Sequence, residues 1–233
     1  MQGNERFSIF LCAVWALLAA GCATTGLGSR TVAAQYISAL VQIDRPEATK
    51  ERYGSVVMIK PEPDNKYFYE DGLFSGIFHV TNSRINFVLT NKTDHSIKIM
   101  WDESAFIGLD GHSCRVAHTG VKYADRNASQ PPSVIPGRTS LTDFVLPTDR
   151  VYYREGFYGK YYSSPGGWEE LSLVLPSSRR ITDVDSTAVQ TFRSEVENNK
   201  GKRFGLLLPL EIEGVVNEYT FWFQVQDVSV IEK

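Results

Sequence analysis

Apolar and polar residues alternate most regularly near the end of the chain. Within VVNEYTFWFQVQDVSVI, residues 215–231, the positions that alternate with Thr220, Trp222, Gln224 and Gln226 are Tyr219, Phe221, Phe223 and Val225. Successive side chains of a strand point to opposite faces of a sheet, so a period of two predicts a half-buried strand.

Shorter apolar stretches separated by turn-forming residues predict further strands. They are SVVMI (55–59), RINFVLTN (84–91), HSIKIMW (95–101), SAFIGL (104–109), SCRVAH (113–118), RTSLTDFVL (138–146), ELSLVL (170–175) and RFGLLLPLEIE (203–213). Two of the separating turns favour hairpins: NKTD at 91–94, and Asp110-Gly111, where glycine can adopt a positive φ angle. About eight to ten short strands without a repeated strand–helix pattern predict a mainly β fold, an antiparallel immunoglobulin-like β-sandwich in one domain over residues 31–233.

Two segments have the spacing of short peripheral helices. In SRTVAAQYISALVQ, residues 29–42, apolar side chains recur at three- and four-residue intervals, and Ser29 is available as a cap. We interpret this segment as an amphipathic helix packed on the side of the domain, the alternative being a helix that contacts a partner or a membrane surface. The second segment, DSTAVQTFRSEVENNKG (185–201), has a polar start, a glycine at its end, and an apolar face made of Val189, Phe192 and Val196.

The start of the chain has a short apolar run that leads into small residues and a cysteine. The apolar run at 9–20 spans about 18 Å as a helix, against roughly 30 Å of bilayer hydrocarbon, so it predicts a secretory signal and not a transmembrane span. The signal ends in LLAAGC, residues 17–22, which resembles the lipobox of bacterial lipoproteins. That resemblance implies that residues 1–21 are removed, that Cys22 is lipidated, and that residues 22–30 form a tether; the alternative is a cleaved signal peptide with an incidental cysteine.

The resemblance also implies a location and extends into the body of the chain. Ala23 and Thr24 follow the cysteine without the aspartate that commonly holds lipoproteins in the inner membrane, so we expect the periplasmic face of the outer membrane. TNKTDHSIKIMWDESAF, GHSCRVAHTGVKYADRN, PGRTSLTDFVLPTD and NKGKRFGLLLPLEIEGVVNEYTFWF resemble uncharacterised bacterial lipoproteins with an immunoglobulin-like sandwich. That group implies a fold and a location, and it has no catalytic residues to carry over.

The cysteine count predicts a protein that is stabilised by its hydrophobic core and not by disulfides, and the charge pattern excludes a basic binding surface. Of the three cysteines, Cys12 lies in the expected signal and Cys22 would be lipidated, which leaves Cys114 without a disulfide partner. The 24 basic and 27 acidic residues are mixed along the chain and give a net charge of −3, so the sequence has no basic footprint for nucleic acid or an anionic membrane. We therefore expect attachment to the membrane through lipid alone.

One cluster of titratable residues, GHSCRVAH, contains His112, Cys114 and His118. In an extended segment the two histidines would be about 20 Å apart, too far to share one zinc ion, so we predict no metal site and no cofactor. The alternative is a metal shared by His112 and Cys114, with further ligands from His79, His95 or carboxylates. The HExxH, GxSxG, P-loop and GxGxxG motifs are absent from the sequence. A buried Cys114 acting as a small hydrophobe is the simpler interpretation, and a Cys114 nucleophile assisted by a histidine stays open as an alternative.

The segment RVYYREGFYGKYYSSPGGW, residues 150–168, gathers five tyrosines, one phenylalanine and one tryptophan among two arginines and one lysine. Aromatic rings and cations on a loop are suited to recognition, because the rings supply contact area at low entropy cost. The candidate ligand-binding residues are Tyr152, Phe157, Tyr158, Tyr161 and Trp168, with a sugar polymer or an extended peptide as the guest. The alternative is that these rings cover one end of the sandwich as a satellite core.

The sequence thus predicts a location and a fold class, and no reaction. The function we expect is a lipid-anchored cell-envelope protein that acts as a non-enzymatic interaction or assembly module. Two alternatives are a binding protein for cell-wall glycan or a small ligand through residues 150–168, and an enzyme that depends on Cys114.

Overall fold

The computed structural model describes residues 29–45, 60–62, 66–182 and 186–232. Cys22 with the lipobox, most of the expected tether and the predicted strand at 55–59 lie outside the described residues. Among the helices that the structure describes, none has the length and apolar character needed to cross a membrane.

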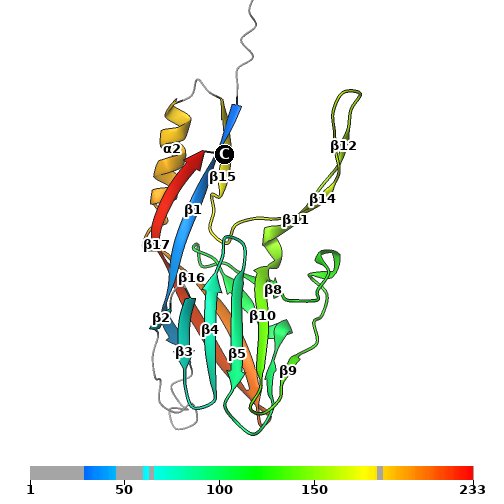
Figure 1. Cartoon of the computed structure of the whole chain (residues 1–233), viewed down its shortest axis with the longest axis vertical. Helices are drawn as coiled ribbons and strands as arrows, with labels where there is room; N and C mark the ends of the chain where they lie inside the picture. Colours follow the sequence, from blue (N-terminus) through cyan, green and yellow to red (C-terminus); the bar gives the residue numbers. More distant parts are fainter. Residues whose placement is uncertain (1–28, 46–59, 63–65, 183–185, 233) are drawn as a thin grey trace, which may run out of the picture.

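Most of the described chain forms one antiparallel sheet that curls on itself (Figure 1). Its strands lie in the order β15-β1-β17-β16-β7-β8-β10-β5-β4-β3-β2, and β6 pairs with β16 and with β9. In chain order they are β1 (Ser29–Asp44), β2 (Lys60–Glu62), β3 (Lys66–Glu70), β4 (Phe74–Val80), β5 (Ile85–Asn91), β6 (Ile97–Ile99), β7 (Ala105–Ile107), β8 (Ser113–Ala117), β9 (Ser133–Ile135), β10 (Ser140–Pro147), β15 (Ser178–Thr182), β16 (Arg203–Ile212) and β17 (Val215–Glu232). The predicted class, mainly β and antiparallel, is confirmed.

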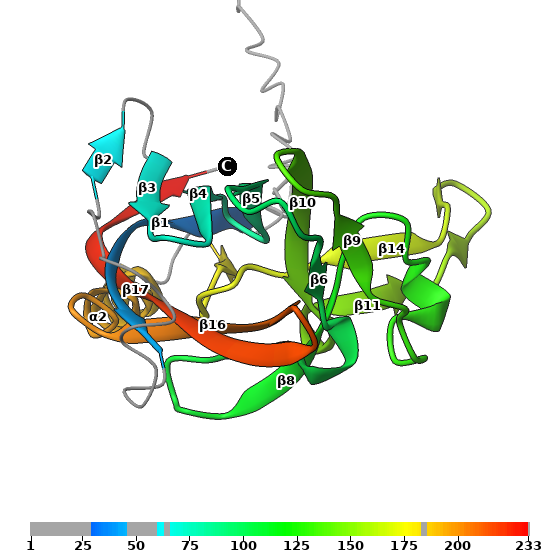
Figure 2. The same cartoon turned by 90° about the horizontal axis from the view of Figure 1, so that it is seen from below.

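The curl brings β17 against β3 and β4 across an aromatic interior. The ring of Phe78 in β4 lies 4.4 Å from that of Phe221 in β17, and the ring of Phe74 lies 5.0 Å from that of Tyr219. Figure 2 shows β1, β16 and β17 on one side of this interior and β3, β4 and β5 on the other. The aromatic positions that alternate along β17 are buried, which confirms the predicted half-buried strand.

The helix predicted over residues 29–42 is wrong, because this segment is strand β1. It pairs with β17 from Val32 to Asp44 and with β15 from Ser29 to Ala33, so Ser29 and Arg30 belong to the sheet and not to a tether. The register shifts at two places, between Ile37 and Ser38 and between Leu40 and Gln42. These irregularities, with apolar residues on both faces of the strand, break the period of two and imitate helical spacing.

The second predicted helix is confirmed as α2 (Ser186–Glu197), which packs against β17 and β15. Phe192 and Val196 are fully buried on the face that the sequence assigns to the core. The chain leaves the helix through a glycine in the left-handed region, Gly201, whose φ is 83°. Side-chain capping by Asp185 or Ser186 falls outside the described part of the chain.

The two predicted hairpins have different outcomes. β7 and β8 pair across the turn that contains Gly111, with φ of 82°, so this hairpin is confirmed. The hairpin at 91–94 is wrong, because β5 pairs with β4 and β10 whereas β6 pairs with β16 and β9. The buried Asn91 side chain donates to the carbonyls of His95 (2.6 Å) and Ile135 (3.0 Å), and it stabilises a corner at which the chain crosses the fold.

Three other strand predictions can be compared directly with the structure. The strands predicted at 138–146 and 203–213 are confirmed as β10 and β16. The strand predicted at 170–175 is wrong after its first residue, because β14 ends at Glu170 and residues 171–175 are not in a strand. Leu173 and Val174 are nevertheless buried, so their apolar character reflects packing against the core and not pairing in a sheet.

A buried carboxylate, Asp71, joins the two sides of the interior. Its side chain is 1% exposed and accepts hydrogen bonds from the hydroxyls of Tyr69 and Tyr219, both at 2.8 Å. It also accepts from the backbone amides of Leu73 (2.8 Å) and Phe74 (3.0 Å). Burial and the neighbouring carboxylate raise the pKa of Tyr69, so this hydroxyl remains a donor.

We expect the substitution Asp71→Ala to lower the free energy of unfolding by about 3 kcal/mol or more, because it removes the acceptor of two buried hydroxyls and two amides. Urea unfolding followed by tryptophan fluorescence measures the change. The exposed carboxylate of Asp125 provides the control, and Asp125→Ala should change stability by less than about 0.5 kcal/mol. An Asp71→Ala protein as stable as the wild type would contradict the assigned role.

Candidate functional site: an aromatic arm

Residues 151–170 form a hairpin that projects from the curled sheet, and we call this segment the aromatic arm. Its lower ribbon pairs β11 (Val151–Arg154) with β14 (Gly167–Glu170), and its tip pairs β12 (Phe157–Tyr158) with β13 (Ser163–Ser164). Figure 1 shows the arm rising from β11 and β14 to β12, clear of the main sheet. The tip turn is closed by a hydrogen bond from the amide of Gly159 to the carbonyl of Tyr162, at 2.9 Å.

The two ribbons of the arm meet where two glycines touch. A Cβ atom on Gly156 would lie 2.8 Å from the backbone nitrogen of Gly166, and a Cβ atom on Gly166 would lie 2.6 Å from the Tyr153 hydroxyl. Side chains larger than hydrogen therefore do not fit at this crossing without displacing the strands. The glycines that interrupt the aromatic segment in the sequence are thus the residues that allow the arm to form.

One face of the lower ribbon is polar. Tyr152 donates to Glu169 at 2.6 Å, Arg154 also donates to Glu169, and a second guanidinium nitrogen of Arg154 donates to Ser164 at 2.9 Å. The hydrogen bonds from Tyr152 and Arg154 lower the pKa of Glu169, and the same carboxylate raises the pKa of Tyr152. At neutral pH this face therefore carries an ionised carboxylate whose partners lie in the arm itself.

The opposite face of the lower ribbon is aromatic and is packed on one side. The rings of Tyr153 and Trp168, which pair across the strands, lie 5.4 Å apart in an edge-to-face contact. The body supplies Tyr123, whose ring is 6.1 Å from that of Trp168, and Arg126, whose guanidinium carbon is 5.3 Å from the same ring. Trp168 thus anchors the arm and keeps part of its surface exposed.

The tip of the arm is the most exposed aromatic surface of the described chain. The exposed fractions are 61% for Phe157, 79% for Tyr158, 91% for Tyr161 and 69% for Tyr162. Phe157 and Tyr162 stack at 6.4 Å, and the ammonium of Lys160 lies 5.2 Å from the ring centre of Tyr161. Burial of such rings is a principal stabilising force, so four rings left in solvent on one projection have no role in a core.

The structure thus brings the five candidate residues to one arm but separates them into two groups. Tyr152 and Trp168 lie in the lower ribbon, whereas Phe157, Tyr158 and Tyr161 lie at the tip. The satellite core that we considered as an alternative is not formed at the tip. Two aromatic residues of the arm were missed, namely Tyr153 and Tyr162. They lie in the same aromatic segment, and only their cross-strand contacts distinguish them as members of the two ring pairs.

A charged cluster fixes the base of the arm to the body. Glu170, the last residue of β14, accepts hydrogen bonds from Ser83 at 2.7 Å, from Arg84 Nε at 3.0 Å and from Tyr123. The Arg84 guanidinium also lies over the ring of Phe144, 4.2 Å from its centre. The hydrogen bonds from Arg84, followed by those from Ser83 and Tyr123, lower the pKa of Glu170 to about 2. The ion pair therefore persists over the neutral range and holds the arm's direction.

Cys114 does not have the surroundings of a reactive thiol. It is partly buried in β8, and its thiol donates to Asp149 at 3.2 Å. Burial and the Asp149 carboxylate raise the pKa of Cys114 to about 12, so the thiol stays protonated at neutral pH.

The two histidines near Cys114 in the sequence, His112 and His118, lie in different surroundings. His118 stacks on buried Trp101 at 4.1 Å and lies 3.3 Å from Asp143, whereas His112 is exposed beside Asp110. The partners of these groups differ, and neither His112 nor His118 hydrogen-bonds to the Cys114 thiol. Within the described ranges, no group of three or more side chains has the arrangement of a metal site.

Comparison of the chain with known protein families, with curated proteins and with solved structures gave no match.

We expect Glu170→Gln to lower the stability of the protein at pH 7 by about 2 kcal/mol, after allowance for solvent screening of Arg84. Because the folded-state pKa of about 2 lies below the ordinary value of 4.5, the wild-type ion pair stabilises fully above pH 4.5. That contribution is lost as the pH falls toward 2, so the difference between wild type and Glu170→Gln should disappear there.

Urea unfolding at a series of pH values measures this difference. Glu155→Gln is the matched control, because Glu155 is an exposed residue of the arm, and it should leave the stability unchanged at every pH. A stability difference between wild type and Glu170→Gln that stays constant from pH 7 to the acid limit would refute the assigned ion pair.

Proposed function

We propose that this protein is a lipid-anchored component of the bacterial cell envelope that acts without catalysis as an interaction module, and that the aromatic arm holds its partner. The observation that carries the proposal is the exposure of Phe157, Tyr158, Tyr161 and Tyr162 on a projecting ribbon whose base is fixed to the body. Aromatic residues are enriched at the energetic centres of protein interfaces, and exposed clusters of them mark interaction sites.

The shape of the tip favours a macromolecular partner, and we propose a protein. Phe157 and Tyr158 are successive residues of one strand and so project from opposite faces of the ribbon. Rings on both faces suit insertion of the arm into a cleft of the partner, whereas a small ligand is bound in a concave site. A cell-wall glycan is the second candidate, favoured by the nearly complete exposure of the Tyr161 ring, which is free to stack on a sugar.

The proposed location rests on the sequence. LLAAGC at residues 17–22 supplies small residues before a cysteine, as lipid attachment and signal cleavage require, and Ala23-Thr24 favours the outer membrane. Two or three acyl chains on Cys22 would give stable anchoring, which one chain does not. The fold would then stand in the periplasm with its arm available to other envelope components.

The proposed fold family is the immunoglobulin-like β-sandwich. It is supported by the packing of aromatic side chains between β17 and β4 within an antiparallel sheet of short strands. A sandwich consists of two sheets, whereas here hydrogen-bonded pairing through β7 and β8 connects β16 to β10. The proposed sandwich therefore has its two sheets joined through these strands. A solved structure in which β3, β4 and β5 do not stack on β16 and β17 would contradict this proposal.

The absence of catalysis is proposed from the chemistry of the candidate groups. The Cys114 thiol has a pKa raised to about 12 and donates to Asp149, so it lacks the thiolate that a nucleophile needs. His118 is stacked on Trp101 and hydrogen-bonds to Asp143, not to the thiol.

For the anchor, we expect mass spectrometry of the native protein to find a mature chain that starts at a diacylglycerol-modified Cys22. Substitution Cys22→Ser should release the protein from the membrane fraction, since the acceptor thiol is lost. An intact residue Met1, or an unmodified Cys22 at the new N-terminus, would refute lipidation.

For the arm, we expect a lysine-reactive cross-linker in intact cells to join Lys160 at the tip to a second envelope protein. The double substitution Tyr158→Ser and Tyr161→Ser should reduce this adduct by roughly tenfold or more, because it removes two exposed rings from the contact. Val134→Ser is the matched control, since Val134 is an exposed apolar residue of β9 outside the arm, and it should leave the adduct unchanged. Loss of the adduct in the Val134→Ser control as well as in the double variant, or persistence of the adduct in the double variant, would contradict the proposal. If the protein binds purified cell-wall glycan and the double variant loses that binding, the second candidate is favoured.

A further inference from the structure

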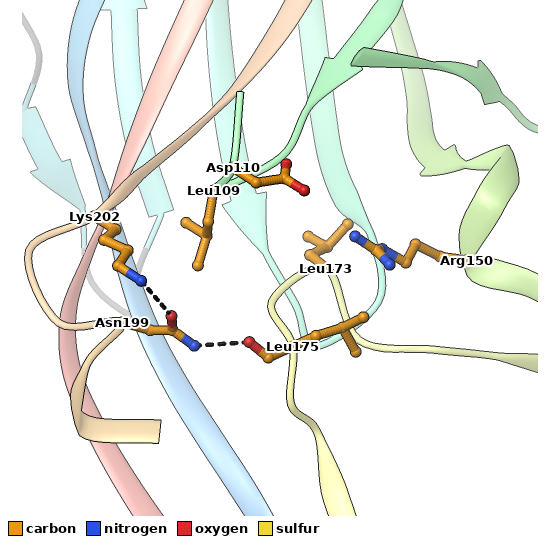
Figure 3. Close-up of a pocket in the computed structure, with 7 residues that line it drawn as sticks. All are labelled: Leu109, Asp110, Arg150, Leu173, Leu175, Asn199 and Lys202. Atoms are coloured by element: carbon orange, nitrogen blue, oxygen red, sulfur yellow. Dashed lines mark hydrogen bonds between the residues drawn. The ribbon is translucent and has the colours of Figure 1, made fainter. Parts of the chain in front are cut away.

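A cavity of about 330 Å³ lies at the base of the aromatic arm, where four separate segments of the chain meet (Figure 3). They are the β7–β8 turn, the residue before β11, the segment between β14 and β15, and the loop between α2 and β16. The residues that line the cavity are Leu109, Asp110, Arg150, Leu173, Leu175, Asn199 and Lys202. Its size is near the lower end of the range of about 300–1,000 Å³ that is usual for small-molecule sites.

Arg150 supplies a largely buried guanidinium that forms an ion pair with Asp149. Four-fifths of its side chain is buried, and its Nε atom has no hydrogen-bond partner among the described residues. The carboxylate of Asp149 is 3.8 Å from Nε, within ion-pair distance but beyond hydrogen-bond distance, and it accepts a hydrogen bond from the thiol of Cys114. In Figure 3 the guanidinium reaches toward Leu173 and the interior of the cavity. A guanidinium presents its donors in a planar fork that fits a carboxylate or a phosphate.

The opposite wall carries a second cation on a fixed support. Asn199 is buried, and its amide nitrogen donates to the carbonyl of Leu175 at 2.7 Å and to the hydroxyl of Tyr36 at 3.3 Å. This orients its side-chain oxygen toward the ammonium of Lys202, which donates to it at 3.3 Å. An ammonium has three donors, so Lys202 can also donate to an acceptor in the cavity.

Leucine side chains separate the two cations, and Figure 3 shows Leu109 and Leu173 between Arg150 and Lys202. The acidic residue of the wall, Asp110, accepts the amide of His112 at 3.1 Å, and this hydrogen bond is the main cause of its lowered pKa. Asp110 is therefore ionised, and the cavity wall carries two positive charges and one negative charge. Asp149, which is not part of the wall, pairs with Arg150 at 3.8 Å and offsets part of its charge, so the complement of the wall is a ligand with one anionic group and an apolar portion.

We propose that this cavity binds a small organic anion whose carboxylate or phosphate group pairs with Arg150 and whose apolar body packs on Leu109, Leu173 and Leu175. Lys202 then donates to the bound molecule from the opposite wall. This site lies beyond the proposed function, because it uses none of the exposed rings of the arm. A bound anion can accept from the terminal guanidinium nitrogens of Arg150, and its apolar body covers leucine side chains of the wall.

The test uses the full protein with hexanoate and hexyl phosphate as probes and backbone amide NMR as the readout. We expect saturable shifts centred on Leu109, Arg150, Leu173 and Asn199 with one or both probes, and the stronger of the two identifies the head group. 1-Hexanol has the same apolar body without the charge, and its affinity should be lower by roughly tenfold or more. Acetate and inorganic phosphate, which lack the apolar body, should also bind more weakly.

The decisive variant is Arg150→Gln, which we expect to weaken binding by roughly tenfold or more. Arg180→Gln is its matched control, since Arg180 is an exposed arginine of β15 outside the cavity, and it should bind as the wild type does. If Arg150→Gln does not fold, Arg150→Lys tests the same point, because it keeps the charge and loses the planar fork.

Several outcomes would overturn the inference. They are the absence of saturable binding of both charged probes, equal binding of 1-hexanol, wild-type affinity in the folded Arg150 variant, or shifts confined to the arm tip. The double substitution Tyr158→Ser and Tyr161→Ser should leave probe binding unchanged, so a failed arm experiment and a failed cavity experiment are distinguishable.

Discussion

The curled sheet depends on a buried carboxyl group, Asp71, that joins its two sides. Burial of a carboxylate is unfavourable unless hydrogen bonds replace its lost hydration, and Asp71 meets this condition with donors from both sides of the fold. Because one donor, Tyr219, belongs to β17 and another, Tyr69, to β3, the requirement fixes how these two strands face each other. The aromatic rings around them contribute hydrophobic stabilisation, and the hydrogen bonds to Asp71 favour one arrangement of those rings over others.

An element could be predicted from the sequence where its local pattern of apolar residues agrees with its long-range contacts. β17 and α2 were predicted correctly, because each has one buried face and a regular period. β1 was misread as a helix, since its irregular pairing with β17 breaks the alternation that identifies a strand. The 91–94 turn was misread as a hairpin because Asn91 is a common turn former, whereas its side chain here bonds to carbonyls from a distant segment. Such long-range partners leave no signal in one sequence.

The candidate site was predictable in composition and not in geometry. The aromatic segment at 150–168 is evident in the sequence, and it does form one continuous structural unit. Its division into an anchored base and an exposed tip depends on Trp168 packing near Arg126 and on Glu170 pairing with Arg84, which are distant in sequence. The cavity next to the arm could not be predicted at all, because its lining comes from four segments that only the fold brings together.

The pairing of β1 has a mechanical consequence. β1 enters the sheet at Ser29 and runs antiparallel to β17 as far as Asp44, with β15 on its other side near the start. Force applied at Ser29 along the strand axis acts in shear, so the hydrogen bonds to β17 share the load and do not break one after another. A strand held in this way resists extraction far better than one peeled from its end. Strand β1 is thus suited to transmit tension into the sheet through many hydrogen bonds at once.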